Sequence, residues 1–230
     1  MSVHENLAVV LLPGMDGTGE LLAALVTRLS AYRPVQVIAY PTRLSLGYDE
    51  LLDYVVSRAP KDPFVVVGES FSGPIAIELA ASLPRVVGLV LASSFARHPM
   101  PSLLAPLARI IDMAWVPNSI AVAALLGSKA RPELRAHLIQ VLARLPRELI
   151  RVRAFDVLRV DKRNRLREVR CPVLCLHGRL DRLVGKKCVD EILSAKPECQ
   201  VRWFEAPHML LETHPDAAAD AINQFCLRLS

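Results

Sequence analysis

The sequence predicts an α/β fold in which a six-stranded, mainly parallel sheet is flanked by helices and interrupted by a helical insertion. Short apolar runs alternate with longer segments whose apolar residues recur at helical spacing, a pattern typical of parallel sheets covered on both faces. About eighty residues separate the fourth expected strand from the fifth, far more than one connection and one helix need. The chain has 230 residues, 52% of them hydrophobic, which is enough for one domain with a substantial core.

The expected strands are short and apolar, and we expect all of them to be parallel. They lie near residues 7–12, 35–40, 64–68, 86–92, 172–177 and 200–205. Leucines at positions 21, 22, 25 and 29 form the stripe of a helix between the first two strands, and a second stripe lies within residues 51–56. Thr213 and Asp216, three residues apart, predict a capping-box start for the last helix.

The third expected strand ends in a tight turn that presents Ser70. Residues 66–74 read Val-Val-Gly-Glu-Ser-Phe-Ser-Gly-Pro, and a helical pattern follows. A strand that turns into a helix within a few residues needs small neighbours around the apex, here Gly68 and Ser72. The apex serine then protrudes as a candidate nucleophile at the positive end of the new helix, which favours the development of an oxyanion there. Ser72 stands where the G-x-S-x-G pattern has its second glycine, and an ordinary strand–turn–helix with an incidental serine is the alternative.

Two other strands end near residues that a serine nucleophile requires. An imidazole must accept the serine proton, and a carboxylate must orient that imidazole. Asp181 follows the strand expected at 172–177, and His208 follows the strand expected at 200–205. A loop aspartate or histidine alone is usually solvated or caps a turn. Three such residues in the order Ser, Asp, His, each after a strand, predict the catalytic residues Ser70, Asp181 and His208.

Four motifs together give the chain a resemblance to the α/β-hydrolase superfamily over nearly its whole length. They are Leu12-Pro13-Gly14-Met15-Asp16-Gly17-Thr18-Gly19, Gly68-Glu69-Ser70-Phe71-Ser72-Gly73, His177-Gly178-Arg179-Leu180-Asp181 and Pro207-His208-Met209-Leu210-Leu211-Glu212. The resemblance implies the α/β-hydrolase fold and a serine esterase with a helical cap over its active site. Relatives with an aspartate nucleophile, the dehalogenases and epoxide hydrolases, are excluded because position 70 is serine.

The resemblance also assigns a role to the glycine loop, residues 13–19, which follows the first strand. In such hydrolases the oxyanion is held by two backbone N–H groups, one from the residue after the nucleophile and one from this loop. These are here Phe71 and Met15. The alternative is that the glycines only form a turn and open a helix. A phosphate cradle is disfavoured because no lysine follows the glycines.

The function expected from these residues is the hydrolysis of small-molecule carboxylic acyl esters through an acyl-enzyme, without a cofactor or metal. A thioesterase, or a hydrolase of acyl esters bound to a carrier protein, would use the same residues and stays an alternative. A non-catalytic ligand-binding homologue that keeps the fold is a third possibility. Activity on p-nitrophenyl esters of graded chain length separates catalysis from binding.

Apolar run lengths and the cysteines indicate the cellular compartment in which the protein is expected. The early part of the chain lacks the layout of a signal peptide, and no apolar run reaches the roughly 18 residues of a membrane span. Five cysteines without a pattern fit buried thiols in a reducing compartment better than disulfides or a zinc site. We therefore expect a cytoplasmic protein.

The long insertion sets the expected domain division. We expect an α/β-hydrolase core of residues 1–95 and 170–230 and a helical cap of residues 96–169. Six prolines divide the insertion into short helices. Apolar cap residues could pack on the core or line an acyl pocket. The expected substrate-binding residues are Gly14, Leu103, Met113 and Trp115.

The cationic segment, residues 147–170, carries nine basic side chains against four acidic ones. Its net charge of +5 equals that of the whole chain, also +5. A solvated basic surface is one interpretation. The other is a docking site for an acidic carrier protein or for the phosphates of a coenzyme A thioester. Nucleic acid is not expected, because aromatic residues do not interleave with the cations.

Overall fold

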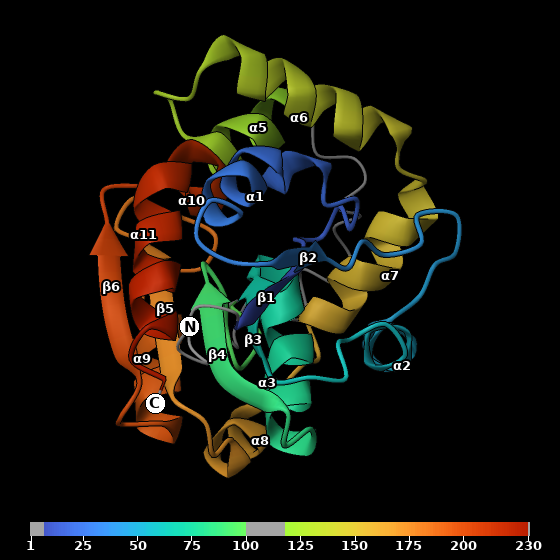
Figure 1. Cartoon of the computed structure of the whole chain (residues 1–230). Helices are drawn as coiled ribbons and strands as arrows, with labels where there is room; N and C mark the ends of the chain where they lie inside the picture. The colour runs from blue at the N-terminus through green and yellow to red at the C-terminus, as the bar shows by residue number, and fades with distance from the viewer. Residues whose placement is uncertain (1–6, 100–117, 230) are drawn as a thin grey trace.

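The computed structural model describes residues 7–99 and 118–229, and its centre is one parallel sheet. The strands are β1 (Ala8–Leu12), β2 (Val35–Val37), β3 (Phe64–Glu69), β4 (Val86–Ala92), β5 (Val173–Gly178) and β6 (Gln200–Phe204). Their order in the sheet is β2-β1-β3-β4-β5-β6, and every pairing is parallel. The predicted fold class is therefore confirmed (Figure 1).

Alternate residues of the central strands face two different helical layers, because side chains along a strand point to opposite faces. On one face Val10, Val66 and Leu91 pack against α2 (Tyr48–Val56), α3 (Gly73–Ser82) and α9 (Lys186–Ala195). On the other face Val9 and Val67 pack against α1 (Ala23–Leu29) and α11 (Pro215–Cys226). Both faces are covered, which explains why these strands are apolar throughout.

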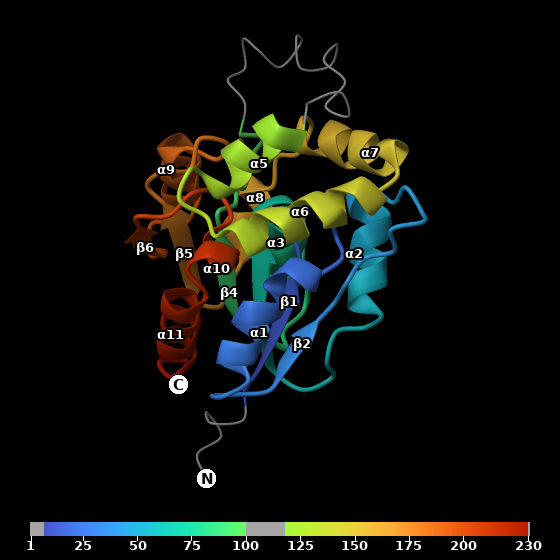
Figure 2. The same ribbon diagram turned by 90° about the horizontal axis from the view of Figure 1, so that it is seen from above.

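The inserted helices α5 (Asn118–Leu126), α6 (Pro132–Arg144) and α7 (Arg147–Val157) lie beyond the carboxyl ends of the strands (Figures 1 and 2). Apolar side chains of α5 and α6 pack on Leu21, in the 3₁₀ turn η2 (Glu20–Leu22), and on Met209. These contacts hold the two helices over the loops that follow β1 and β6. Across residues 7–99 and 118–229, no helix is long and apolar enough to cross a membrane.

A fourth inserted helix, α8 (Arg163–Glu168), lies elsewhere. It packs against α3 and α9, and its Leu166 is buried in the core cluster on that face of the sheet. The division into a core of 1–95 and 170–230 and a cap of 96–169 stays a prediction. The contacts of α8 place this helix with the layer that flanks the sheet.

The start of the last helix differs from the prediction. The chain forms a short helix α10 (Leu210–Thr213) and then α11, which begins at Pro215. Proline disfavours a helical conformation at the residue before it, and His214 has φ −132° and ψ 51°. Thr213 therefore belongs to α10, where its hydroxyl donates to the Met209 carbonyl at 2.7 Å. The predicted capping box at Thr213 is wrong.

Candidate active site

The turn between β3 and α3 holds Ser70 in a strained conformation. Ser70 has φ 46°, a left-handed value that is uncommon for residues other than glycine and that is found at functional turns. The neighbouring chain is closely packed, since a Cβ added to Gly68 would lie 2.7 Å from the Ser72 carbonyl oxygen. A 3₁₀ turn η3 (Ser70–Ser72) leads directly into α3. The strain is maintained because the strand and the helix on either side are both buried.

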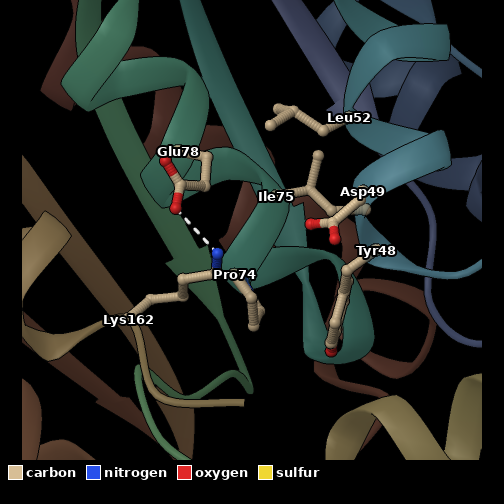
Figure 3. Close-up of a pocket in the computed structure, with 7 residues that line it drawn as sticks. All are labelled: Tyr48, Asp49, Leu52, Pro74, Ile75, Glu78 and Lys162. Carbon is tan, nitrogen blue, oxygen red and sulfur yellow. Dashed lines mark hydrogen bonds and ion pairs between the residues drawn. The ribbon is translucent and has the colours of Figure 1, made fainter.

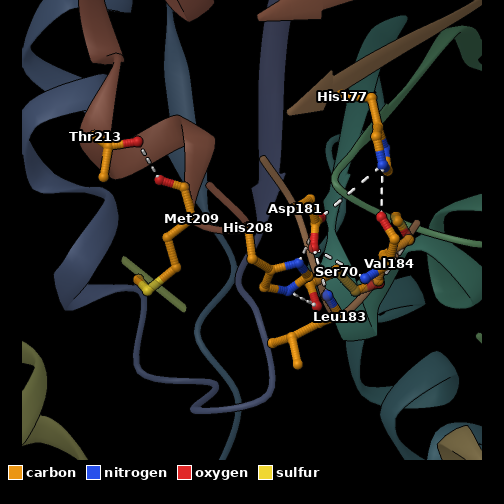
Figure 4. A network of polar contacts seen from close by, with 9 residues as sticks. Ser70, His177, Asp181, Leu183, Val184, His208, Met209 and Thr213 are labelled. Atoms are coloured by element: carbon orange, nitrogen blue, oxygen red, sulfur yellow. Dashed lines mark hydrogen bonds and ion pairs between the residues drawn. The ribbon is translucent and has the colours of Figure 1, made fainter. Parts of the chain in front are cut away.

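The structure brings Ser70, His208 and Asp181 into one hydrogen-bonded chain (Figure 4). The Ser70 hydroxyl lies 2.8 Å from Nε2 of His208. Nδ1 of the same ring lies 2.8 Å from Oδ2 of Asp181. An ionised aspartate can only accept, so Nδ1 is the donor and Nε2 is left to accept the serine proton.

Asp181 is oriented by backbone as well as by His208. Its Oδ1 accepts the N–H groups of Leu183 and Val184, each at 2.9 Å. Both Asp181 and His208 are buried. Because water is excluded, the attraction between the aspartate and a protonated His208 is stronger than at an exposed site.

A second histidine, His177, lies beside Asp181 without taking part in the chain. Its Nε2 donates to the Val184 carbonyl at 2.6 Å, and Nε2 is 4.0 Å from Oδ2 of Asp181. Burial lowers the pKa of His177 below its usual value, although the nearby Asp181 opposes that change. Because His177 is neutral, it does not compete with His208 for the negative charge of Asp181.

Three side chains from elsewhere in the chain bind the backbone of three successive residues of the glycine loop. The Ser72 hydroxyl donates to the Pro13 carbonyl. Oε2 of Glu69 accepts the Gly14 N–H at 3.1 Å. Nη1 of Arg153 donates to the Met15 carbonyl at 2.6 Å. Two of these side chains come from the serine turn and one from α7, so the loop is fixed from two sides.

Ser72 therefore does more than fit where a glycine is usual. Its side chain is fully buried, and its hydroxyl lies 2.5 Å from that of Tyr40. Tyr40 can donate to Ser72 while Ser72 donates to Pro13. A glycine at position 72 would leave the Pro13 carbonyl without this donor.

Arg153 is the least expected member of the site. The cationic segment predicted exposed charge, but the Arg153 side chain is 0% exposed and its Nη2 also donates to the Pro41 carbonyl at 3.4 Å. Its guanidinium carbon lies 5.5 Å from the centre of the Tyr40 ring and 5.7 Å from that of Phe71, where cation–π attraction contributes. Burial lowers the pKa of Arg153 from its usual value, yet arginine stays protonated in proteins.

The expected oxyanion donors lie next to these groups. Phe71 is the first residue after Ser70, at the start of η3, where N–H groups have no partner within the helix. Its ring is buried and stacks on Tyr48 with centres 4.6 Å apart. Met15 lies between the tethered atoms of the glycine loop, and no acceptor among the described residues takes its N–H. Their role in holding an oxyanion remains a proposal.

The remaining expected site residues have mixed outcomes. The Gly14 N–H points to Glu69, so it is not free to bind a substrate. Leu103, Met113 and Trp115 lie outside the described residues. Where side chains are described, no group of three or more histidine, cysteine, aspartate or glutamate residues is placed to hold a metal ion.

At least four of the nine cations in the cationic segment form ion pairs. Lys162 and Arg165 form ion pairs with Glu78 of α3, at 2.7 and 2.8 Å, and Arg163 pairs with Asp161 at 2.6 Å. The Lys162–Glu78 pair borders a shallow hollow between α2 and α3 (Figure 3). Arg151 is more exposed, at 71% of its side chain, and lies 3.7 Å from Glu148. The segment is therefore a mixture of paired, buried and exposed cations and not one continuous positive surface.

Comparison with known families and curated proteins gives consistent matches. Residues 9–221 match the model of the alpha/beta hydrolase family. The chain is 28% identical to a pimeloyl-[acyl-carrier protein] methyl ester esterase of Proteus mirabilis, over 96% of this chain and 93% of that protein. A protein of the same description from Cronobacter sakazakii is 30% identical, over 98% of this chain and 95% of that protein.

Solved structures share the fold at low identity. The enol-lactonase of Burkholderia xenovorans superposes with a TM-score of 0.83 at 17% identity, over 96% of this chain and 91% of that one. An esterase of Exiguobacterium antarcticum gives 0.84 at 13% identity, over 96% and 92%. At such identities the likeness establishes the fold alone.

Proposed function

The chain belongs to the alpha/beta hydrolase family, and from that premise we propose that it is a serine hydrolase of carboxylic esters. The observation that carries the proposal is the chain of hydrogen bonds from Ser70 through His208 to Asp181, at the carboxyl ends of β3, β5 and β6. Nucleophile, base and orienting carboxylate are each within 2.8 Å of the next group, which is the contact that proton transfer requires.

The mechanism follows from this order of contacts. Oγ of Ser70 attacks the ester carbonyl carbon while its proton passes to Nε2 of His208. The carbonyl oxygen becomes an oxyanion, which the N–H groups of Met15 and Phe71 stabilise. When the tetrahedral intermediate collapses, the ester C–O bond breaks and His208 returns the proton to the leaving alcohol. The acyl group remains on Ser70.

In the second half of the reaction, water takes the place of Ser70 as the attacking group and Ser70 becomes the leaving group. A water molecule gives a proton to His208 and attacks the acyl-enzyme carbonyl carbon. A second tetrahedral intermediate forms on the same two N–H groups, then releases the acid and restores the Ser70 hydroxyl. In both halves Asp181 stabilises the positive His208 ring and keeps Nδ1 protonated.

The direct test is hydrolysis of p-nitrophenyl esters of graded acyl length by the purified chain. We expect turnover by the parent and its loss in Ser70→Ala, while Ser57→Ala, an exposed serine at the end of α2, serves as a matched control. Chain-length preference would describe the acyl pocket. If the folded parent hydrolyses none of the esters, the non-catalytic ligand-binding alternative is favoured instead.

A more specific substrate is an acyl ester carried by an acidic carrier protein. Two observations favour it: the relatives named as pimeloyl-[acyl-carrier protein] methyl ester esterases, and the exposed cations on and after α7, such as Arg151 and Arg159. Charge complementarity of this kind raises the rate of encounter. The catalytic residues are the same for a small ester and for a carrier-bound one.

This proposal is tested with pimeloyl-[acyl-carrier protein] methyl ester and a free monomethyl ester. Arg151→Gln with Arg159→Gln should raise KM for the carrier-bound substrate and leave the free ester unchanged. High salt should have the same effect on the parent, since exposed charges are screened over about 10 Å at 0.1 M. Release of methanol with the thioester intact separates an ester hydrolase from a thioesterase. Equal responses of both substrates would contradict the docking role.

A further inference from the structure

Two carboxyl groups are buried beneath the glycine loop and take no part in the chain of Ser70, His208 and Asp181. Glu69 ends β3 and is 5% exposed, and Glu212 in α10 is 3% exposed. A buried carboxylate is costly unless it is paired. Neither residue has an ion pair with lysine or arginine within the described part of the chain. Some other arrangement must make their burial tolerable.

Each of the two carboxyl groups is close enough to the other to change its pKa, and a hydrogen bond between them is an arrangement that this proximity allows. Ionised carboxylates have only acceptor atoms, so such a bond requires a proton on one of them. Oε2 of Glu69 already accepts the Gly14 N–H. By contrast, no N–H or hydroxyl donor in residues 7–99 and 118–229 reaches Oε2 of Glu212. The proton is therefore better placed on Glu212, with Glu69 as the acceptor.

The surrounding charges agree with this assignment. Burial raises the pKa of Glu212 well above its usual value, and the adjacent Glu69 and Asp16 raise it further. For Glu69, burial is again the main cause of a raised pKa, but the contacts with Glu212, His208 and the Gly14 N–H oppose it. Glu20, on the neighbouring η2, is directed to solvent and pairs with Arg144 at 2.6 Å.

Glu69 connects this pair of carboxyl groups to the expected oxyanion donor, because it binds the backbone of the glycine loop. The Pro13–Gly14 peptide is held at both ends, with its oxygen bound by Ser72 and its N–H by Glu69. The next peptide, Gly14–Met15, has its oxygen bound by the Gly17 N–H at 3.0 Å. Rotation of this peptide is thereby limited, and it carries the Met15 N–H.

We propose that Glu69, kept ionised by a proton that Glu212 holds, is a positioning residue that aims the Met15 N–H at the oxyanion. The inference rests on the proposed serine hydrolase mechanism. Loss of the Glu69 contact leaves the Pro13–Gly14 peptide held only at its oxygen, by Ser72, and the Met15 N–H is then less well placed in the transition state. Loss of the Glu212 proton puts two carboxylates in contact beside Asp16, and their repulsion displaces the same loop.

Two substitutions at Glu69 test the contact. An oxyanion donor contributes only in the transition state, so its loss lowers kcat by about 10²–10³-fold with little change in KM. Glu69→Leu should lower kcat for a short p-nitrophenyl ester about 100-fold or less, because the donor is displaced and not removed. Glu69→Gln should recover most of that loss, since its amide oxygen can accept the Gly14 N–H. Equal kcat in Glu69→Leu and the parent would overturn the proposal.

The pH dependence of kcat tests whether Glu212 holds a proton. The parent should lose kcat as the pH rises through the raised pKa of Glu212. Glu212→Gln stays a neutral donor, so it should keep kcat within about threefold at neutral pH and retain it at alkaline pH. Glu205→Gln, an exposed carboxylate paired with Arg179, is the control and should keep the parent profile. Coincident alkaline profiles of Glu212→Gln and the parent would overturn the proposal.

Stability supplies a readout that does not depend on turnover. A carboxyl whose folded pKa is raised stabilises the fold fully below its unfolded pKa, and that stabilisation is lost as the pH rises through the folded pKa. The Tm of the parent should therefore fall more steeply than that of Glu212→Gln as the pH rises from the ordinary glutamate range. Parallel Tm curves would also count against a proton on Glu212. Retained turnover in Ser70→Ala would instead refute the hydrolase mechanism, so the two failures are distinguishable.

Discussion

The glycine loop and the cationic segment are both rich in polar contacts, but they place those contacts in opposite surroundings. In the glycine loop, contacts to the backbone come from the buried side chains of Glu69, Ser72 and Arg153. In the cationic segment, most ion pairs join partly exposed side chains at the surface. Buried polar contacts are costly to lose, whereas exposed ion pairs contribute little. Substitutions in the two regions should therefore differ widely in effect.

Helix α7 carries one exposed and one buried arginine, two positions apart in the sequence. Arg151 is 71% exposed, and Arg153 is fully buried against the glycine loop. Residues two positions apart on a helix do not share a face. The same residue type thus contributes surface charge at one position and a structural link between the inserted helices and the site at the other.

The largest effects are expected where the buried groups transfer a proton. His208→Ala should lower kcat/KM by about 10⁴-fold or more, because triad members act as a unit. Asp181→Asn should lower it by about 10³–10⁴-fold, because the imidazole is left in the wrong tautomer. Turnover of a p-nitrophenyl ester measures both. Normal turnover of the Asp181 variant would mean that another carboxylate orients His208.

The next largest effect is expected for the buried arginine. Arg153→Met keeps the length of the side chain but leaves the Met15 and Pro41 carbonyls without their donor, at a cost of about 1–3 kcal/mol in the free energy of unfolding. Because the glycine loop loses one tether, kcat should fall as well. Arg151→Met, on the exposed face of the same helix, should change the free energy of unfolding by less than about 0.5 kcal/mol. Urea unfolding of the pair measures the difference, and equal losses would show that α7 is not anchored through Arg153.

A smaller effect on activity is expected at Ser72, which touches the glycine loop but not the reacting atoms. Ser72→Ala should destabilise the fold by about 1–3 kcal/mol, because the buried Pro13 carbonyl loses its donor. It should keep most of its turnover, since Ser70, His208 and Asp181 are untouched. The two tethers nearer the Met15 N–H also remain, because Glu69 still accepts the Gly14 N–H and Arg153 still donates to the Met15 carbonyl. Ser194→Ala, an exposed serine in α9, controls for the loss of a hydroxyl. Turnover as low as that of Ser70→Ala would contradict this separation of roles.

The smallest effect is expected at the surface ion pairs. Arg163→Gln removes the partner of Asp161 in a contact that solvent screens. The free energy of unfolding, measured by thermal unfolding, should change by no more than about 0.5 kcal/mol. Turnover of a small ester should not change. A loss as large as that of Arg153→Met would show that exposure does not distinguish the two regions.

The same contrast explains what the sequence predicts well. The strands are recognisable because their apolar runs are local, and Ser70, Asp181 and His208 are recognisable because each follows a strand. Arg153 resembles the other cations around it, since its burial depends on contact with Met15, 138 positions earlier in the chain. Glu69 and Glu212 are likewise far apart in the sequence, 143 positions from each other. The capping pattern at Thr213 predicts the wrong helix start because Pro215 disfavours a helical conformation at His214, where the chain breaks between α10 and α11.

The assignment of Ser70 as the nucleophile is tested most directly by covalent labelling. A fluorophosphonate probe should modify the folded parent once, and trypsin should release the adduct within residues 62–85, the peptide that carries Ser70, Ser72 and Ser82. Fragment ions from that peptide distinguish the three serines. We expect the adduct on Ser70, no labelling of Ser70→Ala, and undiminished labelling of Ser72→Ala at saturating probe. An adduct on Ser72, or continued labelling of Ser70→Ala, would contradict the proposed mechanism.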